Sequence, residues 1–389
     1  MKIKDICTSV TDGSHNPPQG IEKSEYMMLS SKNVFDDEIT FDEPRFLSEK
    51  DFEREYTRTK VAVGDVLLTI VGTVGRAATV DEDMPAFTLQ RSVAVLHPKS
   101  DVCLPRFLMY ALRRKRTYIE NRAKGVAQKG IYLKEVSDID IPIPDISNQE
   151  IIINKLDKVK TILKHRQKEV LALDNLIKAR FVEMFGDPIS NPMKWDIYRL
   201  EECLERIDNG KSFICSDKPR TGDNPAILKL SAATYGDYRP NENKALLDES
   251  LFVESSEVHA GDLLFTRKNT PELVGTAAYV QNTPPKLMMP DLIFRLVPNE
   301  KVNAVFLWQL INCKEFRPVI QAISGGSAKS MSNISKERLG KIKVICPPRE
   351  LQDSLIPFVE QTDKSKVAVR RALDEAQLLF DSLMQQYFG

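Results

Sequence analysis

A short polar stretch near the start of the chain contains residue types that adenine amino-methyltransferases use to hold a flipped base. Asn16-Pro17-Pro18 is most of their Asn-Pro-Pro-aromatic signature, whose fourth side chain stacks on the base. Gln19 stands at that fourth place. Such an enzyme also needs a glycine-rich loop that opens a helix and holds S-adenosylmethionine. The best candidate, TIVGTVGR at 69–76, leads into further β-like sequence, which disfavours a methyltransferase.

Nuclease and metal chemistry lack their residues as well. Pro144-Asp145 begins like a metal-dependent nuclease motif, but Ile152 stands where a lysine should follow Glu150. No Walker phosphate-binding loop is present. No pair has metal-ligand spacing among the four histidines, His15, His97, His165 and His259. We therefore expect no catalytic residue, metal or cofactor in this chain.

The bulk composition is that of an ordinary globular protein. The chain has 389 residues, 42% hydrophobic and 28% charged, which is enough for two or three domains. Its six cysteines are far apart and form no Cys-x-x-Cys pair, as expected in a reducing compartment. Neither a signal peptide nor an apolar stretch of membrane-spanning length is visible. We expect a cytoplasmic protein without membrane contact.

The charges are unevenly distributed although the net charge is zero. Residues 105–134 carry nine basic side chains and one acid, whereas residues 36–55 carry nine acids and three bases. Such a partition lets one surface face phosphates while the protein stays soluble. A charge run is usually a solvated helix face. However, a basic helix followed by a glycine-centred turn recurs at 310–336, and this recurrence favours DNA contact.

Lysine and arginine neutralise phosphates, and arginine, glutamine and asparagine can read base edges in the major groove. We therefore predict DNA contacts from the two basic segments and from polar turns such as DGSH at 12–15, NGKS at 209–212 and TRKNT at 266–270. The predicted DNA-binding residues are Ser14, His15, Arg76, Arg113, Arg114, Lys124, Gln128, Lys129, Lys211, Ser212, Arg267, Lys268, Asn269 and Lys329.

An internal repeat explains why such segments occur twice. VTDG at 10–13 matches IDNG at 207–210, and VGDVLLT at 63–69 matches AGDLLFT at 260–266, both with an offset of 197. Towards the end of each copy the offset is 203, and it pairs Gln149 with Gln352 and Phe185-Gly186 with Phe388-Gly389. An offset that drifts so little over most of the chain indicates a duplication.

Each copy should combine an α+β domain with a long helix. Short β-rich runs, such as DVLLTIVG and DLLFTR, are separated by Gly, Pro and Asn turns. Helices are expected near 105–121 and 303–322, and Gly186 should end the first long helix. The predicted parts are domain 1 at 1–147, a spacer helix at 148–186, a linker and domain 2 at 187–348, and a second spacer helix at 349–389.

The spacer helices carry apolar residues at alternating three–four spacing, the stripe of a helix that seeks a partner helix. We favour pairing of each helix with its repeat. Packing of each helix on its own domain is the alternative. The predicted helix-pairing residues are Ile152, Leu156, Val159, Leu163, Val170, Leu173, Ile177, Leu355, Val359, Val369, Leu373, Phe380 and Leu383.

The whole organisation resembles the specificity subunit of Type I restriction–modification enzymes. The resemblance rests on the duplicated VGDVLLT and AGDLLFT segments, on VAQKGIYLKEVSDIDIPIPDISNQEII at 126–152, and on ARFVEMFGDPISNPMKW at 179–195. It implies two homologous target-recognition domains, each reading one half of a split DNA site. It also implies two spacer helices that pair as an antiparallel coiled coil, relate the domains by a pseudo-twofold axis, and measure the gap.

The same resemblance implies the partners. These are double-stranded DNA, two methyltransferase subunits docked along the helices, and motor-nuclease subunits, with S-adenosylmethionine, ATP and Mg²⁺ held by the partner subunits. The chain itself is then a non-catalytic subunit. Two alternatives remain: a coiled-coil scaffold that binds only protein, which would show no salt-dependent binding to DNA, and an amino-methyltransferase, which would itself bind S-adenosylmethionine.

Overall fold

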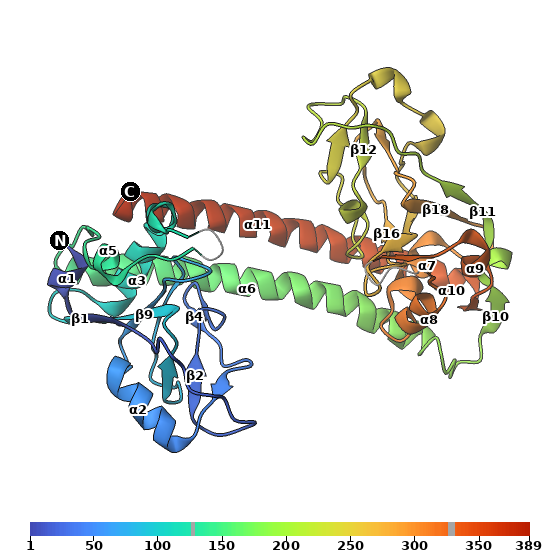
Figure 1. Ribbon diagram of the computed structural model, residues 1–389. Helices are drawn as coiled ribbons and strands as arrows, with labels where there is room; N and C mark the ends of the chain where they lie inside the picture. Colours follow the sequence, from blue (N-terminus) through green and yellow to red (C-terminus); the bar gives the residue numbers. More distant parts are fainter. Residues whose placement is uncertain (126–128, 326–330) are drawn as a thin grey trace. The chain divides into compact units, whose positions relative to one another are not determined.

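A computed structural model describes residues 1–125, 129–325 and 331–389 (Figure 1). The chain forms two compact units. Unit 1 contains Met1–Gln167 together with Arg370–Gly389, and unit 2 contains Lys168–Val369. Each unit thus combines the beginning of one long helix with the end of the other, since these helices are α6, Ile146–Phe185, and α11, Ile356–Phe388.

Each unit is built on a four-stranded antiparallel sheet. In unit 1 the order is β1-β9-β6-β7, and in unit 2 it is β11-β18-β14-β16. The two orders correspond strand by strand under the repeat, and the runs DVLLTIVG and DLLFTR form the predicted strands β6 and β14. The bounds are β1 Cys7–Asp12, β6 Val66–Thr69, β7 Ala77–Thr79, β9 Val93–Pro98, β11 Leu204–Asn209, β14 Leu263–Thr266, β16 Ala277–Tyr279 and β18 Ile293–Pro298.

A smaller three-stranded sheet forms a second lobe in each unit. The orders are β5-β2-β8 and β13-β12-β17, and in both lobes the central strand runs parallel to the last strand. The fold is therefore repeated even between residues 14 and 60, where the two copies share few residues. The strands are β2 Met27–Leu29, β5 Arg45–Phe46, β8 Phe87–Leu89, β12 Ala226–Leu228, β13 Asn243–Ala245 and β17 Leu287–Met288, with a hairpin of β3 Val34–Phe35 and β4 Glu38–Ile39 beside the first lobe.

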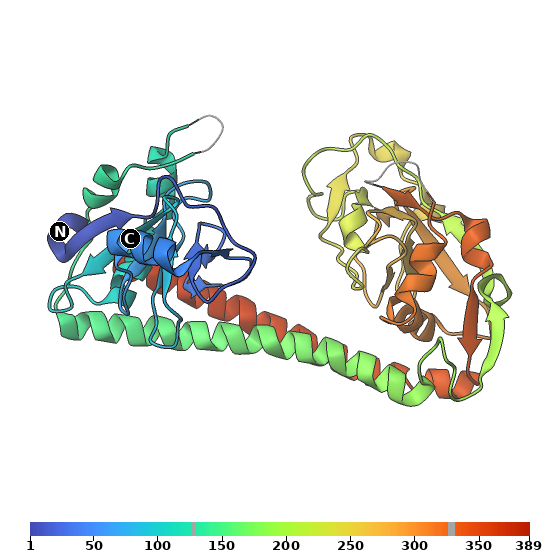
Figure 2. The same ribbon diagram turned by 60° about the horizontal axis from the view of Figure 1, so that its bottom comes forward.

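Unit 2 has further short strand pairs. Strands β10 and β20 pair antiparallel and lie side by side in Figures 1 and 2. Strands β15 and β19 also pair antiparallel. Their bounds are β10 Asp196–Arg199, β15 Lys268–Asn269, β19 Ser332–Asn333 and β20 Lys343–Cys346.

Short helices cover the sheets, and here the sequence prediction is partly wrong. The single helices expected near 105–121 and 303–322 are each two helices, because the chain leaves the helical path at Lys115 and again between Asn312 and Arg317. The helices are α1 Ile3–Ile6, α2 Glu49–Thr59, α3 Pro105–Arg114, α4 Arg116–Arg122, α5 Leu133–Ser137, α7 Ala304–Asn312, α8 Arg317–Ala322, α9 Lys336–Gly340 and α10 Arg349–Asp353.

The repeat extends to single hydrogen bonds at the start of α6 and, in the second copy, in the short helix that precedes α11. The buried Gln149 amide accepts from Leu104 N at 2.8 Å and donates to the Val102 and Pro144 carbonyls. Gln352 accepts from Asn303 N at 3.0 Å and donates to the Lys301 and Pro347 carbonyls. A buried amide needs such partners. Gln149 therefore attaches the beginning of α6 to its domain, and Gln352 does the same for the short helix α10, which precedes α11.

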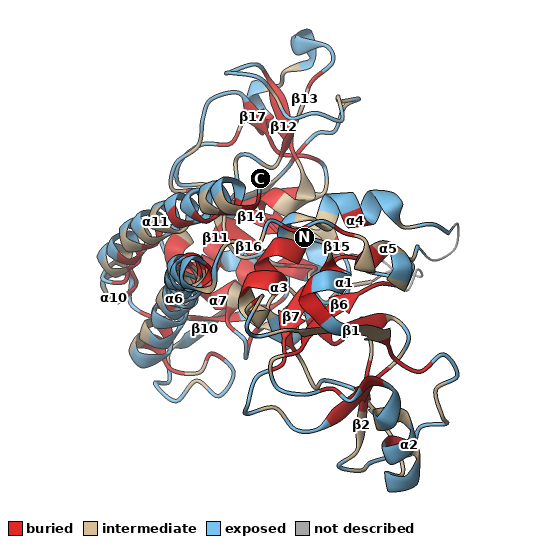
Figure 3. Ribbon diagram, turned by 90° about the vertical axis from the view of Figure 1, so that its left-hand side faces the viewer, coloured by how far each residue is buried: buried red, intermediate tan, exposed pale blue. Residues whose placement is uncertain are grey.

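Both long helices show the alternation expected of a buried stripe, with buried and exposed positions alternating along them in Figure 3. Helix α6 ends at Phe185, where Gly186 takes a φ of 75° and its N–H donates to the Val182 carbonyl at 2.8 Å, as predicted. Within the described residues, no helix is both long and apolar enough to cross a bilayer.

Candidate nucleic-acid interface

The repeated polar turns meet at one end of each four-stranded sheet. Because β9 runs antiparallel to both β1 and β6, the ends of β1 and β6 lie beside the start of β9. The turn after β1 requires glycine, since a Cβ on Gly13 would lie 2.1 Å from the Leu89 carbonyl oxygen. Gly210 occupies the same place in unit 2, where a Cβ would lie 2.1 Å from the Pro290 oxygen. The VTDG and IDNG repeats thus build the same tight turn.

In unit 1 this end of the sheet forms a cleft of about 740 Å³, which we call the basic cleft. Its walls come from the ends of β1, β6 and α2, from the β8–β9 turn, and from the segment leading into α5. Five basic side chains and one acid line it together with an exposed tyrosine: His15, Arg58, Arg91, Lys124, Lys134, Asp12 and Tyr132. A positive, partly aromatic cleft of this kind suits a phosphate backbone and adjoining bases.

The one acid of the basic cleft orients two of its basic side chains. The Arg58 guanidinium donates to the Asp12 carbonyl oxygen at 3.1 Å and to Asp12 Oδ1 at 3.0 Å. His15 Nε2 lies 2.7 Å from Asp12 Oδ2. Half of each basic side chain remains exposed, whereas Asp12 is largely buried. Asp12 therefore fixes the direction of Arg58 and His15 and leaves both open to a ligand.

Helix α2 places Arg58 at the cleft. Ser48 caps its first turn, because the Ser48 hydroxyl oxygen accepts from Asp51 N at 3.2 Å. Phe52 faces inward and stacks on Tyr56 at 5.5 Å between ring centroids, so one face of α2 is held on the small lobe. Arg58 lies in the last turn, near the helix C-terminus, which favours a cation.

The equivalent end of the sheet in unit 2 gathers the predicted residues of the second copy. Lys211 and Ser212 follow β11, and both are exposed. The Ser212 hydroxyl donates to the Asp291 carboxylate of the turn before β18. Arg267 follows β14, stacks on Phe294 at 4.8 Å and donates to Asn333 at 3.3 Å. Lys268 pairs with Asn333 in the β15–β19 ladder.

Other predicted DNA-binding residues have structural roles. Ser14 is 5% exposed and pairs through its backbone with Leu89 and Arg91. Asn269 is 7% exposed, and its side-chain amide donates to Thr234 at 3.1 Å. Since these two side chains are buried in the unit, their assignment to DNA contact is corrected to a role in the fold.

Two predicted DNA-binding residues at the end of α3 contact another helix, and their binding to DNA stays a prediction. Arg113 packs on the Phe380 ring at 5.5 Å, and burial lowers the pKa of its guanidinium while the Asp36 carboxylate opposes the shift. Arg114 donates to Gln385. Both residues therefore contact the C-terminal part of α11. Arg76 stacks on Phe35 at 4.9 Å.

One further predicted residue, Lys129, lies within the described residues. The backbone of Lys129 accepts from Gly72 N at 2.9 Å, and its side chain is exposed. Gln128 and Lys329 lie outside the described residues.

The predicted helix-pairing residues all avoid full exposure, but the buried ones all join domain cores. Ile152, Leu156 and Val159 belong to the core of unit 1 together with Phe380, Met384 and Phe388. Ile177 belongs to the core of unit 2 with Phe181, Phe185, Leu355 and Val359. The intermediate positions are Leu163, Val170, Leu173, Val369, Leu373 and Leu383.

The two helices also contact each other inside each unit. In unit 1, Lys155 Nζ lies 3.0 Å from the Tyr387 hydroxyl. In unit 2, Lys366 Nζ lies 3.0 Å from Asp174. Both interpretations of the stripe are therefore partly right, because each helix packs on domain cores and against the other helix.

Sequence reasoning missed Arg58, Arg91, Lys134 and Tyr132 at the basic cleft. Arg58 lies next to an acid-rich segment, and no helix was predicted there. Arg91 is a single charge in a turn. Lys134 was counted in the basic segment, but nothing distinguished it from its neighbours. Within the described ranges, no group of three or more His, Cys, Asp or Glu residues could hold a metal.

Comparison with known proteins gives a consistent family match. Residues 1–172 match the family model of the Type I restriction modification DNA specificity domain. The chain is 31% identical over 192 residues to the EcoEI specificity subunit of Escherichia coli, covering 49% of this chain and 32% of that protein. It is 22% identical over 392 residues to the putative MjaX specificity subunit of Methanocaldococcus jannaschii, covering 93% and 86%.

The E. coli matches are partial, since the alignments span about a third of the EcoEI and EcoBI subunits. Solved structures extend the likeness of fold to the whole chain. The Type I S subunit from M. genitalium superimposes with a TM-score of 0.60 at 13% identity, covering 100% of this chain and 95% of that one. A chain solved to study complex assembly of a type I R-M system gives 0.55 at 16% identity, covering 100% and 96%.

Proposed function

We propose that this chain, whose residues 1–172 match the family model of the Type I restriction modification DNA specificity domain, is the DNA-reading subunit of a Type I restriction–modification complex. Each unit reads one half of a bipartite site, and the paired helices set the gap between the halves. The observation that carries this proposal is the basic cleft of unit 1, formed at the sheet end that is repeated in unit 2. In this role the chain is not itself catalytic, and it reads DNA for partner subunits that methylate adenine and move or cut the duplex.

Methylome sequencing tests the proposal and the ruler role of the helices together. Cells that produce the full chain with its partner subunits are expected to carry adenine methylation at one motif of two half-sites and a fixed gap. Inserting one heptad into α6 within 155–175, with a matched heptad in α11, adds about 10 Å of helix. The gap should then lengthen by about three base pairs, each of which rises about 3.4 Å.

A motif without two separated halves would contradict the bipartite reading. An unchanged gap after the double insertion would contradict the ruler. An insertion of the same seven residues into the exposed loop near 222–223 serves as the control, since that loop belongs to neither long helix and Gly222 has open space around it. It should leave the gap unchanged.

Exposed apolar side chains on the long helices support docking of two methyltransferase subunits there. Leu171 and Val182 of α6 are 64% and 43% exposed, and eleven residues, three helical turns, separate them on one face. Ile151 and Ile162, also eleven residues apart, are 50% and 47% exposed. Apolar residues aligned along an otherwise polar helix mark an interaction surface.

Replacing both Leu171 and Val182 by glutamate is expected to weaken co-purification with the methyltransferase subunit by roughly tenfold or more, because buried anchors carry most interface energy. Ala172→Glu, an exposed change about 100° around the same helix from Leu171, is the matched control. Melting temperatures should change little for either protein, since both sites are exposed. Equal co-purification of the double variant and the control would contradict docking at this face.

A further inference from the structure

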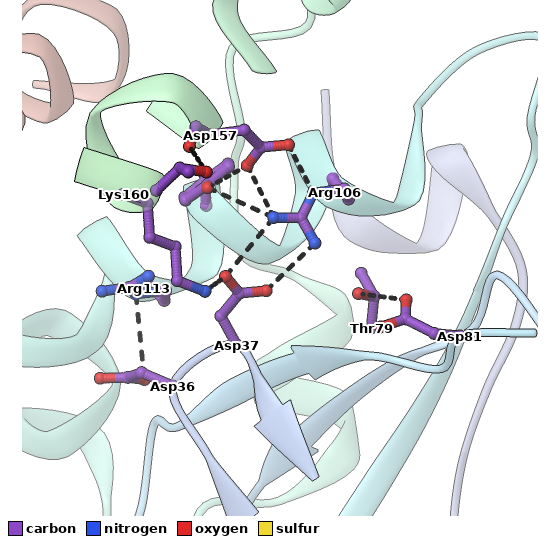
Figure 4. Close-up of polar contacts among 10 residues, drawn as sticks. Asp36, Asp37, Thr79, Asp81, Arg106, Arg113, Asp157 and Lys160 are labelled. Atoms are coloured by element: carbon purple, nitrogen blue, oxygen red, sulfur yellow. Dashed lines mark hydrogen bonds and ion pairs between the residues drawn. The ribbon is translucent and has the colours of Figure 1, made fainter. Parts of the chain in front are cut away.

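In unit 1 an ionic cluster holds the hairpin β3–β4, which lies beside the small lobe (Figure 4). Asp36 and Asp37 form the tip of this hairpin. Asp37 adopts a left-handed φ of 59°, and its N–H donates to the Ala77 carbonyl of β7 at 2.8 Å. Only 3% of the Asp37 side chain is exposed. The hairpin therefore delivers a carboxylate into the interior of the unit.

The buried carboxylate is held by cations from two helices. Arg106 of α3 binds Asp37 at 3.2 Å, and Lys160 of α6 forms an ion pair with the same carboxylate. Arg106 also binds Asp157 of α6 at 2.9 and 2.6 Å, and the Tyr110 hydroxyl donates to Asp157. The network thus joins the hairpin, α3 and the spacer helix α6.

Asp36 forms the outer part of the network. Arg116 of α4 binds it, and Arg113 Nε lies 4.0 Å away. Three carboxylates, with Asp157, face four cations. Buried ion pairs add little net stability against apolar residues of the same volume, whereas removal of one partner leaves a costly unpaired charge. Such a network is therefore better suited to fixing one geometry than to stabilising the fold.

The hairpin packs against the four-stranded sheet, where its strands contact β6 and β7, and it also shares an apolar cluster with the small lobe. Val34 and Ile39 belong to the same apolar cluster as Leu29 of β2 and Leu89 of β8. Arg91 of the basic cleft lies in the turn between β8 and β9. A shift of the hairpin relative to α6 would consequently shift one wall of the cleft.

Unit 2 holds the corresponding place differently. Trp308 of α7 donates to the Gly236 carbonyl at 2.8 Å, a neutral contact. Under the offset of 203, Asp157 and Lys160 correspond to Glu360 and Asp363, two acids on α11. Asp363 binds Lys366 of its own helix at 2.6 Å and accepts from Gln281. The place of Lys160, which binds the hairpin in unit 1, is thus occupied by an acid, Asp363, in unit 2.

We propose that Asp37, Arg106 and Lys160 are positioning residues, which lock the small lobe of unit 1 onto α6 and so fix where the first half-site falls relative to the gap. This inference rests on the proposed function. A base-pair step is about 3.4 Å, so a lobe that moves by that distance reads a half-site displaced by one base pair. These three residues would determine the length of the gap in the recognised site, whereas the residues of the basic cleft would determine the base sequence of the half-site.

Asp37→Asn is the decisive variant, because asparagine has nearly the same shape, tolerates the left-handed φ and lacks the charge. The full chain is produced with its partner subunits, and the methylome is sequenced. Both half-site sequences should be retained. The share of methylated sites whose gap differs by one base pair should rise roughly tenfold, as expected when a buried charge pair is broken. Lys160→Met should act likewise, and Lys160→Arg should restore the wild-type gap.

Asp101→Asn, an exposed change in the same unit, should give the wild-type gap distribution. A wild-type methylome without a bipartite motif contradicts the proposed function and not the lock. A clear wild-type motif with an unchanged gap distribution in Asp37→Asn overturns the lock. If Asp37→Asn does not fold, judged by its melting temperature, the comparison of Lys160→Met with Lys160→Arg decides in the same way.

Discussion

A chain that ends before residue 377 is expected to lose the fold of a domain encoded more than two hundred residues earlier. The last turns of α11 supply three buried side chains to the core of unit 1, Phe380, Met384 and Phe388. The Phe388 ring lies 5.0 Å from Phe107 of α3, and Phe380 lies 6.2 Å from Tyr110. Removing one buried phenylalanine costs about 3–5 kcal/mol, and a whole domain is stable by about 5–15 kcal/mol. Losing all three side chains should therefore unfold unit 1.

The single variant Phe388→Ala gives the graded form of this experiment. It should lower the free energy of unfolding of unit 1 by about 3–5 kcal/mol. Leu378→Ala, at a position that is 70% exposed, should stay within about 0.5 kcal/mol of the wild type. Amide hydrogen exchange in β6 and β9 measures the stability of unit 1. Both tryptophans, Trp195 and Trp308, lie in unit 2, so their fluorescence reports on that unit alone.

The expected pattern is fast exchange in unit 1 with unchanged tryptophan fluorescence. Equal protection of β6 and β9 in Phe388→Ala and Leu378→Ala would contradict the role of the C-terminal turns in that core. A simultaneous change of the tryptophan signal would mean that the two units unfold as one.

The repeat in the sequence already contained this arrangement in part. Pairing Phe185-Gly186 with Phe388-Gly389 identified two equivalent helix ends. The structure shows that Phe185 packs against Phe306 of α7 at 4.9 Å, just as Phe388 packs against Phe107 of α3. Apolar periodicity in the sequence predicts which face of a helix is buried, but it does not predict which part of the protein covers that face. An apolar stripe looks the same whether it meets a helix or a domain, which explains why both interpretations were partly right.

The basic segment shows where the sequence prediction assigned too much to DNA contact. Nine cations in thirty residues favoured DNA contact, yet Arg106, Arg113 and Arg116 are bound by acids of the hairpin and of α6. The acid-rich segment 36–55 was visible in the sequence, but its ion pairs with the basic segment join residues 69 to 80 positions apart and depend on tertiary structure. Arg116 also donates to the Gly75 carbonyl, and Arg317 donates to the equivalent Gly275. A recurrent basic residue can therefore be recurrent because the fold needs it.

Binding to the bipartite duplex should lose much of its salt dependence when Arg91, Lys124 and Lys134 are changed together to alanine. These side chains are exposed at the basic cleft, and no ion pair of theirs is needed for the fold described above. Each phosphate neutralised adds about 0.9 to the slope of log K against log salt. Three lost contacts should lower the magnitude of the slope by nearly three. The loss of affinity of the variant relative to the wild type should therefore be about a hundredfold larger at 0.15 M salt than at 1 M.

The triple variant Lys23→Ala, Lys50→Ala and Lys158→Ala removes the same charge from exposed positions of unit 1 that do not line the cleft. The complex with partner subunits is titrated with a duplex of its own motif over a range of salt concentrations. The control should keep a slope within about one of the wild type, because only contacts at the interface release counterions. If both triple variants lower the slope equally, net charge drives binding, and the basic cleft is not where unit 1 meets DNA.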